Sequence, residues 1–201
     1  MIKRIFIIGD SHIHHMSGEF TSLTKPKALE IGYSFKERKN YDLFFVWQHS
    51  RTAFKVDLEY LESLLNKHLS DINEETVIIL EFGIMDILLG YFSKYKNEEE
   101  VIAKYVNEGI KFANKYKTNL IFMVPWCKTQ NTEIYNFLQK IENVLEVKSL
   151  ENNIPIPIKV LENAVERQYT PFDLLGHNTR EDYEKILDYI TFKVKEIDNG
   201  K

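Results

Sequence analysis

The segment Ile5–His12, with the sequence IFIIGDSH, decides the fold class of this chain. Its first four residues form an apolar run of β-strand length, which stops abruptly at Gly9. Ser11 follows two residues later, where the carboxyl edge of a parallel sheet presents side chains to ligands. We therefore expect a buried strand that ends in a turn and brings a hydroxyl group to the edge where α/β proteins usually carry out chemistry.

Further apolar runs of strand length alternate with amphipathic stretches along the chain. Most of these runs are almost continuously apolar, which is typical of strands buried on both faces of a parallel sheet. The predicted strands are Lys3–Gly9, Tyr41–Trp47, Thr76–Gly83, Asn119–Trp126 and Ile156–Leu161. Apolar residues at helical spacing, or a capping residue, predict helices over Thr52–Leu69, from Asn97, over Thr132–Leu150 and from Thr179. The alternation predicts an α/β fold, a three-layer αβα sandwich around a five-stranded parallel sheet, in which Ser17–Asn40 is a long irregular loop near the site.

Length and composition indicate an ordinary soluble globular protein. The 201 residues fit one domain, residues 1–201, which is large enough to bury a core without disulfides or metals. A formal net charge of −4 argues against a nucleic-acid partner. The longest apolar runs are strand-sized and fall far short of the ~20 residues that a membrane span requires. The single cysteine, Cys127, is compatible with a reducing cytoplasm, and abundant Ile, Phe, Lys and Asn are typical of a bacterial protein from an AT-rich genome.

Polar residues follow the predicted strands and would meet at one edge of the sheet. Ser11 follows the first strand, and Asp173 and His177 come just before the last helix, so we expect these side chains at the same rim. A serine hydroxyl becomes an effective nucleophile when a base takes its proton, and histidine titrates near neutral pH. The pattern predicts a nucleophile at Ser11, a base at His177 and an acid at Asp173 that orients the imidazole. Asp10 is instead expected to organise the turn by accepting hydrogen bonds from nearby backbone N–H groups.

In these residues the chain resembles the SGNH hydrolases, also called the GDSL esterase/lipase superfamily. Gly9-Asp10-Ser11 matches the first sequence block of that family, and Asp173 with His177 matches the last block. The resemblance implies a flavodoxin-like arrangement of the sheet and a Ser-His-Asp triad. It also implies that the protein needs no cofactor and no metal.

The two middle blocks of the family are matched less closely. The third block, Gly-x-Asn-Asp in most members, is present as residues 83–86, Gly-Ile-Met-Asp, and is similar to the Phe-Gly-Glu-Ile-Asp variant of some members. Met85 therefore stands where the family has an asparagine that donates to the oxyanion, and losing one such donor typically costs about 10²–10³ in rate. Ser50 replaces the glycine of the second block, although its backbone N–H can still donate. Asp173 lies four residues before His177 where the family usually has three, which affects the alignment of the orienting acid.

The resemblance implies hydrolysis of a carboxylic ester, or acyl transfer from one. The substrate would be a small-molecule or glycan ester, for instance an O-acetylated carbohydrate. Backbone N–H groups of Ser11 and Ser50 would stabilise the oxyanion, and Arg51, His12 and Asn178 are candidates for the donor missing at Met85. The residues expected to form the oxyanion and substrate-binding site are Ser50, Gly83, Met85, Asp10, His12 and Arg51.

Two alternatives remain open at this point. The departures at Met85 and at Asp173 also fit a degenerate member of the family that binds carbohydrate without hydrolysing it. Asp10, His12 and His14 fit, in addition, the Asp-x-His-x-His opening of metal-dependent amidohydrolases, in which both histidines bind zinc. That alternative requires a (β/α)₈ barrel, which usually needs about 250 residues, and further histidines at later strand ends. The sequence does not indicate an oligomeric state.

Overall fold

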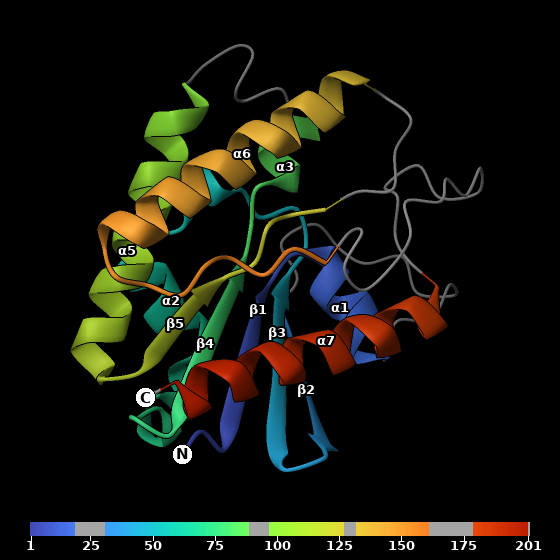
Figure 1. Ribbon diagram of the computed structural model, residues 1–201, viewed down its shortest axis with the longest axis vertical. Helices are drawn as coiled ribbons and strands as arrows, with labels where there is room; N and C mark the ends of the chain where they lie inside the picture. Colours follow the sequence, from blue (N-terminus) through green and yellow to red (C-terminus); the bar gives the residue numbers. More distant parts are fainter. Residues whose placement is uncertain (19–30, 89–96, 127–131, 161–178, 201) are drawn as a thin grey trace.

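The computed structural model describes residues 1–18, 31–88, 97–126, 132–160 and 179–200 (Figure 1). Its five strands are β1 (Arg4–Gly9), β2 (Ile31–Arg38), β3 (Tyr41–Gln48), β4 (Thr76–Glu81) and β5 (Asn119–Phe122). The α-helices are α1 (Ser11–Ser17), α2 (Leu58–Leu64), α3 (Ile84–Leu88), α5 (Glu98–Tyr116), α6 (Thr132–Glu151) and α7 (Arg180–Asn199). Two short 3₁₀ helices, η1 (Ala53–Lys55) and η2 (Asn66–Asp71), flank α2.

The five strands form one sheet in the order β2-β3-β1-β4-β5. The strand that carries the opening motif is central: β1 pairs in parallel with both β3 and β4, and β4 pairs in parallel with β5. The register places Gly9, at the end of β1, between Trp47 on β3 and Glu81 on β4. Three strand ends therefore meet at one edge of the sheet, as expected for an α/β protein.

The fifth strand differs from the prediction in both identity and direction. It is β2, which lies inside the segment expected to be an irregular loop, and it runs antiparallel to β3 at the edge of the sheet. A two-residue turn, Lys39 and Asn40, joins β2 to β3, and Lys39 adopts the left-handed conformation with a φ of 56°. Residues 156–160, the described part of the expected strand Ile156–Leu161, do not form a strand: Ile158 makes an isolated bridge to Met123.

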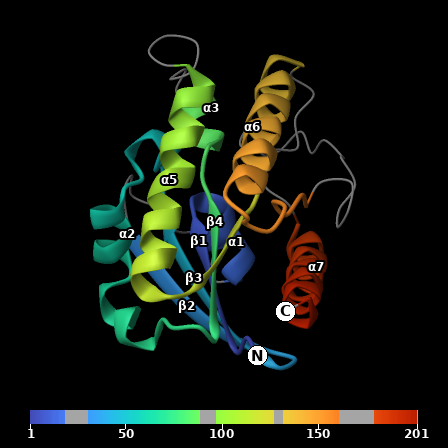
Figure 2. The same cartoon turned by 60° about the vertical axis from the view of Figure 1, so that its left-hand side comes forward.

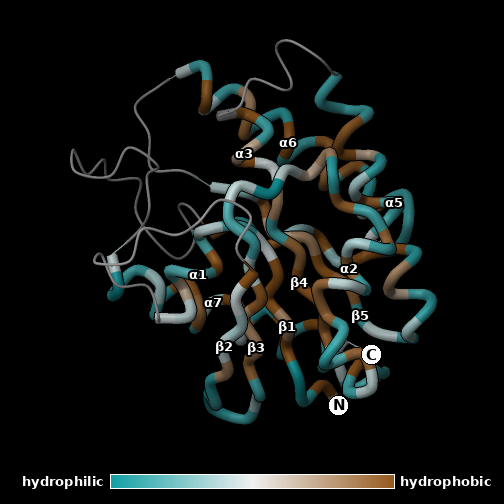
Figure 3. Tube along the Cα trace, turned by 180° about the vertical axis from the view of Figure 1, so that it is seen from behind, coloured by the Kyte–Doolittle hydropathy of each residue, from teal (hydrophilic) through white to brown (hydrophobic). Residues whose placement is uncertain are grey.

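Helices cover both faces of the sheet, which confirms the three-layer αβα sandwich (Figure 2). Alternate residues of β1 point to opposite faces, as the geometry of a strand requires. Phe6 and Ile8 pack in the core cluster that includes buried residues of α2, α5 and α6. Ile5 and Ile7 pack in the second cluster, which includes buried residues of α1 and α7. Both faces of β1 are therefore buried, and Figure 3 shows β1 and β4 as hydrophobic over most of their length.

Three of the four predicted helices are confirmed, and the fourth is broken. Asn97 caps α5 by accepting a hydrogen bond from the Glu99 N–H, α6 covers the range expected from Thr132, and Thr179 forms a capping box with Asp182 at the start of α7. The continuous helix expected over Thr52–Leu69 is instead η1, α2 and η2. The break occurs because Val56 is extended and the Asp57 side chain caps a new helix.

Among the described residues, no helix combines the length and the apolar character that crossing a membrane requires.

Candidate active site

Ser11 is the first residue of α1 and lies directly after the central strand β1. The turn is organised by Asp10, the N-cap of α1, whose Oδ1 accepts a hydrogen bond of 2.9 Å from the His12 backbone N–H. This confirms the structural role predicted for Asp10. The side chain of Ser11 is half-buried, and its N–H belongs to the first turn of a helix, whose N–H groups have no acceptor within that helix. Ser11 therefore stands at the edge of the sheet where the sequence predicted it.

Ser50 lies in the turn after β3 and has a left-handed backbone conformation, with a φ of 60°. Glycine adopts this conformation without cost, whereas other L-residues lose roughly 1–2 kcal/mol. The turn thus has the backbone expected of the glycine that the resemblance assigns to the second block. The Ser50 side chain is exposed, so it is the backbone at this position that the turn specifies.

The segment after β4 contains Gly83 in the turn itself, and Met85 and Asp86 in the first residues of α3. Gly83 has a φ of 138°, and a Cβ at this position would lie 3.1 Å from the Pro125 ring. Met85 packs against the small apolar cluster that contains Ile84, so its side chain has a packing role. A thioether provides no hydrogen-bond donor, so it offers no replacement for the asparagine of the family.

Asp86 ties this turn to the segment after β3. Its two carboxylate oxygens accept hydrogen bonds from the backbone N–H groups of Ala53 (2.6 Å) and Phe54 (3.1 Å), at the start of η1. Burial raises the pKa of Asp86 to about 6, and these two N–H groups oppose the rise because they stabilise the charged form. Asp86 therefore has a structural role.

Arg51 is occupied by contacts within its own loop. Its guanidinium lies over the Tyr60 ring, 3.6 Å from the centroid, and donates a hydrogen bond to the Lys55 carbonyl. These contacts stabilise the turn that contains Ser50. A role of Arg51 in substrate binding remains a prediction.

The other two members of the predicted triad, Asp173 and His177, lie outside the described residues, as do Cys127 and Asn178. The structure therefore positions Ser11 and the two turns at Ser50 and Gly83, and the Ser-His-Asp arrangement remains a prediction.

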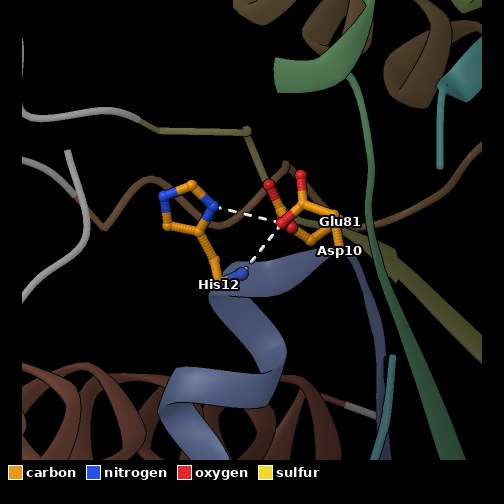
Figure 4. A group of neighbouring side chains, drawn as sticks. All are labelled: Asp10, His12 and Glu81. Carbon is orange, nitrogen blue, oxygen red and sulfur yellow. Dashed lines mark hydrogen bonds and ion pairs between the residues drawn. The ribbon is translucent and has the colours of Figure 1, made fainter. Parts of the chain in front are cut away.

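A buried cluster of Asp10, His12 and Glu81 lies beneath the turn (Figure 4). The Oδ1 atom of Asp10 accepts a second hydrogen bond, of 3.1 Å, when the His12 Nδ1 carries its proton. Glu81 ends β4, and one possible ligand atom from each of the three residues lies within 4.8 Å of the other two. Burial, and then the adjacent Asp10 carboxyl, raise the pKa of Glu81 well above its usual range. The sequence analysis did not identify Glu81 as a site residue, although a charged residue directly after four apolar strand residues indicates a buried carboxyl at a strand end.

Two further histidines meet next to this edge. The His14 Nδ1 and the His49 Nε2 are 2.9 Å apart, and the His14 ring stacks on Trp47 with 4.3 Å between centroids. One of these two nitrogens must donate and the other must accept, so the contact requires one of the rings to be neutral. Sequence reasoning missed this pairing. It also separates His14 from the cluster around Asp10 and His12, so the Asp-x-His-x-His metal set is not brought together. The open sheet likewise excludes the (β/α)₈ barrel, and the amidohydrolase alternative is wrong.

Comparisons with known proteins show that the fold is shared with esterases. No protein-family model and no curated protein sequence matches the chain. A proposed acylhydrolase from Bacteroides fragilis superposes with a TM-score of 0.64 at 14% identity, over 97% of this chain and 88% of that one. The acetyl xylan esterase AlAXEase superposes with a TM-score of 0.62 at 12% identity, over 95% and 99% of the two chains. A catalytic mutant of Axe2, an acetylxylan esterase from Geobacillus stearothermophilus, gives a TM-score of 0.57 at 11% identity, over 94% and 92%. The chain therefore has the α/β fold of these proteins over nearly its whole length.

Proposed function

We propose that the chain is a serine-dependent ester hydrolase of the SGNH type, with Ser11 as its nucleophile. The observation that carries the proposal is the position of Ser11 at the first turn of α1, directly after the central strand of a sheet whose fold is shared with esterases. The left-handed turn at Ser50 and the positive-φ turn at Gly83 lie at the ends of the two neighbouring strands. These are the positions that the SGNH resemblance assigns to the second and third blocks.

The proposed reaction uses the three predicted catalytic side chains. Ser11 Oγ attacks the acyl carbonyl while His177 takes its proton, and Asp173 holds the imidazole in the required orientation. The backbone N–H groups of Ser11 and Ser50 stabilise the tetrahedral oxyanion. The alcohol then leaves with the proton from His177, and water hydrolyses the acyl-enzyme by the same steps.

We further propose an O-acetylated carbohydrate as the substrate class. Two of the three structural neighbours named above are acetylxylan esterases, and this supports an acetyl ester over a long-chain lipid ester. Serine-directed labelling tests the nucleophile without knowledge of the natural substrate. A fluorophosphonate should modify wild-type protein at Ser11, and Ser11→Ala should lose both labelling and turnover of p-nitrophenyl acetate.

The matched control is Ser63→Ala. Ser63 is an exposed serine of α2 whose hydroxyl donates to the Tyr60 carbonyl, and its removal should leave labelling unchanged. Turnover that persists in a folded Ser11→Ala protein would remove Ser11 from the mechanism.

A second candidate is a degenerate, carbohydrate-binding member of the same fold. Met85 favours it, because this residue packs in an apolar cluster where the family has a donor. This candidate predicts that wild-type protein binds acetylated or plain xylan but shows no turnover and no fluorophosphonate labelling.

A further inference from the structure

Two buried carboxyl groups lie side by side beneath the turn that carries Ser11. Asp10 follows β1 and Glu81 ends β4, and both side chains are 0% exposed. The parallel register pairs Gly9 with Glu81. A Cβ on residue 9 would lie 2.8 Å from Glu81 Oε2, so the glycine leaves the space that the Glu81 carboxyl occupies.

Two negative charges at this depth require compensation. Removing a carboxylate from water is costly, and a second carboxylate close by increases the cost. The buried residues of the described chain include no lysine and no arginine that would offset the pair. One added proton on the pair removes one of the two charges and supplies a hydrogen-bond donor between them.

The hydrogen bonds indicate which of the two carboxyls holds that proton. Asp10 Oδ1 accepts the His12 backbone N–H and faces the His12 Nδ1, and both contacts stabilise a charge on Asp10. Glu81 has fewer such contacts: the backbone N–H of Asp10 favours its ionised form, and burial outweighs that effect. Ionised Glu81 would therefore be the less stabilised of the two groups.

The other titratable groups that influence this pair do not change the assignment. Tyr105, on α5, is fully buried, and its pKa is raised by burial first and then by the charge of Glu81. Asp86, on α3, lies close enough for the Asp10 charge to raise its pKa, so it adds negative charge near the pair. The His12 backbone N–H and ring Nδ1, on α1, both face the Asp10 carboxyl (Figure 4).

We propose that Glu81 carries a proton at neutral pH and donates it in a hydrogen bond to the Asp10 carboxylate. Glu81 is then a positioning residue: it fixes the Asp10 carboxyl, which in turn caps the helix that begins at Ser11. The inference goes beyond the proposed function and does not depend on it, because the proton would be present whether or not the chain hydrolyses esters.

Infrared spectroscopy of the unmutated protein tests the proposal directly. At about pH 8, roughly two pH units above the pKa of Asp86, ordinary carboxyls are ionised and show no acid C=O band. We expect one remaining acid C=O band, which shifts when all glutamates carry ¹³C at the side-chain carboxyl and disappears in Glu81→Gln. The matched control is Glu181→Gln, which removes an exposed glutamate and should leave the band in place.

Three outcomes would overturn the proposal. No band at about pH 8 means that the proton resides elsewhere, for example on His12. A band that the glutamate label does not shift places the proton on Asp10. One equivalent of bound divalent metal in the purified protein, with the band appearing only after chelation, means that a cation and not a proton compensates the two carboxylates.

Unfolding equilibria provide a second test, which uses the amide as a mimic of protonated Glu81. Unfolded Glu81 loses its proton near pH 4.3, whereas the folded state keeps it, so wild-type stability falls relative to Glu81→Gln as pH rises. The ratio of the unfolding constants, wild type over variant, should rise about tenfold per pH unit from about pH 5 until the folded protein loses its proton. A ratio that does not change between pH 5 and pH 8 would contradict the proposal, and so would a ratio that falls.

Discussion

Replacing Asp86 with asparagine should change the pH dependence of stability by an amount that follows from the structure. Burial raises the pKa of this carboxyl from 3.8 in the unfolded chain to about 6 in the folded protein. Folded Asp86 therefore keeps a proton that unfolded Asp86 loses, and the stabilisation that comes from this proton disappears as pH rises from about 4 to about 6. A rise of roughly two pH units corresponds to about 3 kcal/mol, because one unit is about 1.4 kcal/mol.

Asp86→Asn also lowers the free energy of unfolding by an amount that does not depend on pH. Asp86 accepts two backbone N–H groups, from Ala53 and Phe54, and an asparagine amide has only one oxygen to offer them. Leaving one buried N–H without a partner costs about 1–3 kcal/mol. Asp86→Asn should therefore be less stable than wild type near pH 4, and should recover by about 3 kcal/mol relative to wild type by pH 7.

Urea unfolding followed by tryptophan fluorescence at a series of pH values measures this difference. Ile79→Val is the matched control, because it loses about 0.5–1.5 kcal/mol in the core without removing a titratable group. Its difference from wild type should stay constant with pH. Stability curves of wild type and Asp86→Asn that run parallel from pH 4 to pH 7 would refute the reasoning, because Asp86 would then titrate alike in the folded and unfolded chain.

Three other substitutions test the turns around Ser11. Ser50→Gly removes the strain of a left-handed serine and should raise the free energy of unfolding by roughly 0.5–1 kcal/mol, because the greater freedom of glycine in the unfolded chain offsets part of the gain. A lower stability of the variant in urea would contradict this prediction. Gly9→Ala forces a Cβ against the Glu81 carbonyl oxygen and should lower the free energy of unfolding by about 1–3 kcal/mol. An unchanged urea midpoint would show that β1 and β4 separate easily. Met85→Asn restores the donor that the SGNH resemblance implies and should raise the turnover of p-nitrophenyl acetate by about 10–100-fold. An unchanged turnover would mean that the backbone donors alone stabilise the oxyanion.

The layers and most elements of this fold could be predicted from the sequence because buried positions of strands and helices require apolar residues at regular spacing. Apolar runs such as the one ending at Gly9 occur where both faces of a strand are covered, and capping residues such as Asn97 and Thr179 locate helix starts. The edge strand β2 was missed because it is half-exposed and mixes apolar and polar residues, and because its turn uses Lys39 in the left-handed conformation. Lysine at such a position gives no turn signal of the kind that glycine or asparagine gives.

Those residues of the candidate site that directly follow a single strand could be predicted from the sequence. Ser11 and Ser50 each follow one apolar run, and their places at the edge could be inferred from the run alone. The contact of Glu81 with Asp10 depends on the register between β1 and β4, and the contact of His14 with His49 depends on how α1 packs near β3. Register and packing are set by the whole core, so no local pattern reveals them.

The turn after β4 separates two roles that the SGNH pattern combines in adjacent residues. Gly83 supplies the positive-φ backbone, and Asp86 anchors the turn through two hydrogen bonds to η1. Neither role depends on the side chain of Met85, which contacts an apolar cluster instead. On the SGNH resemblance, Gly83 and Asp86 match the third block and Met85 takes the place of its donor. Because neither role depends on the Met85 side chain, the turn should accept an asparagine without refolding. Under the proposed function, the effect of Met85→Asn on turnover then measures how far the backbone N–H groups of Ser11 and Ser50 suffice to stabilise the oxyanion.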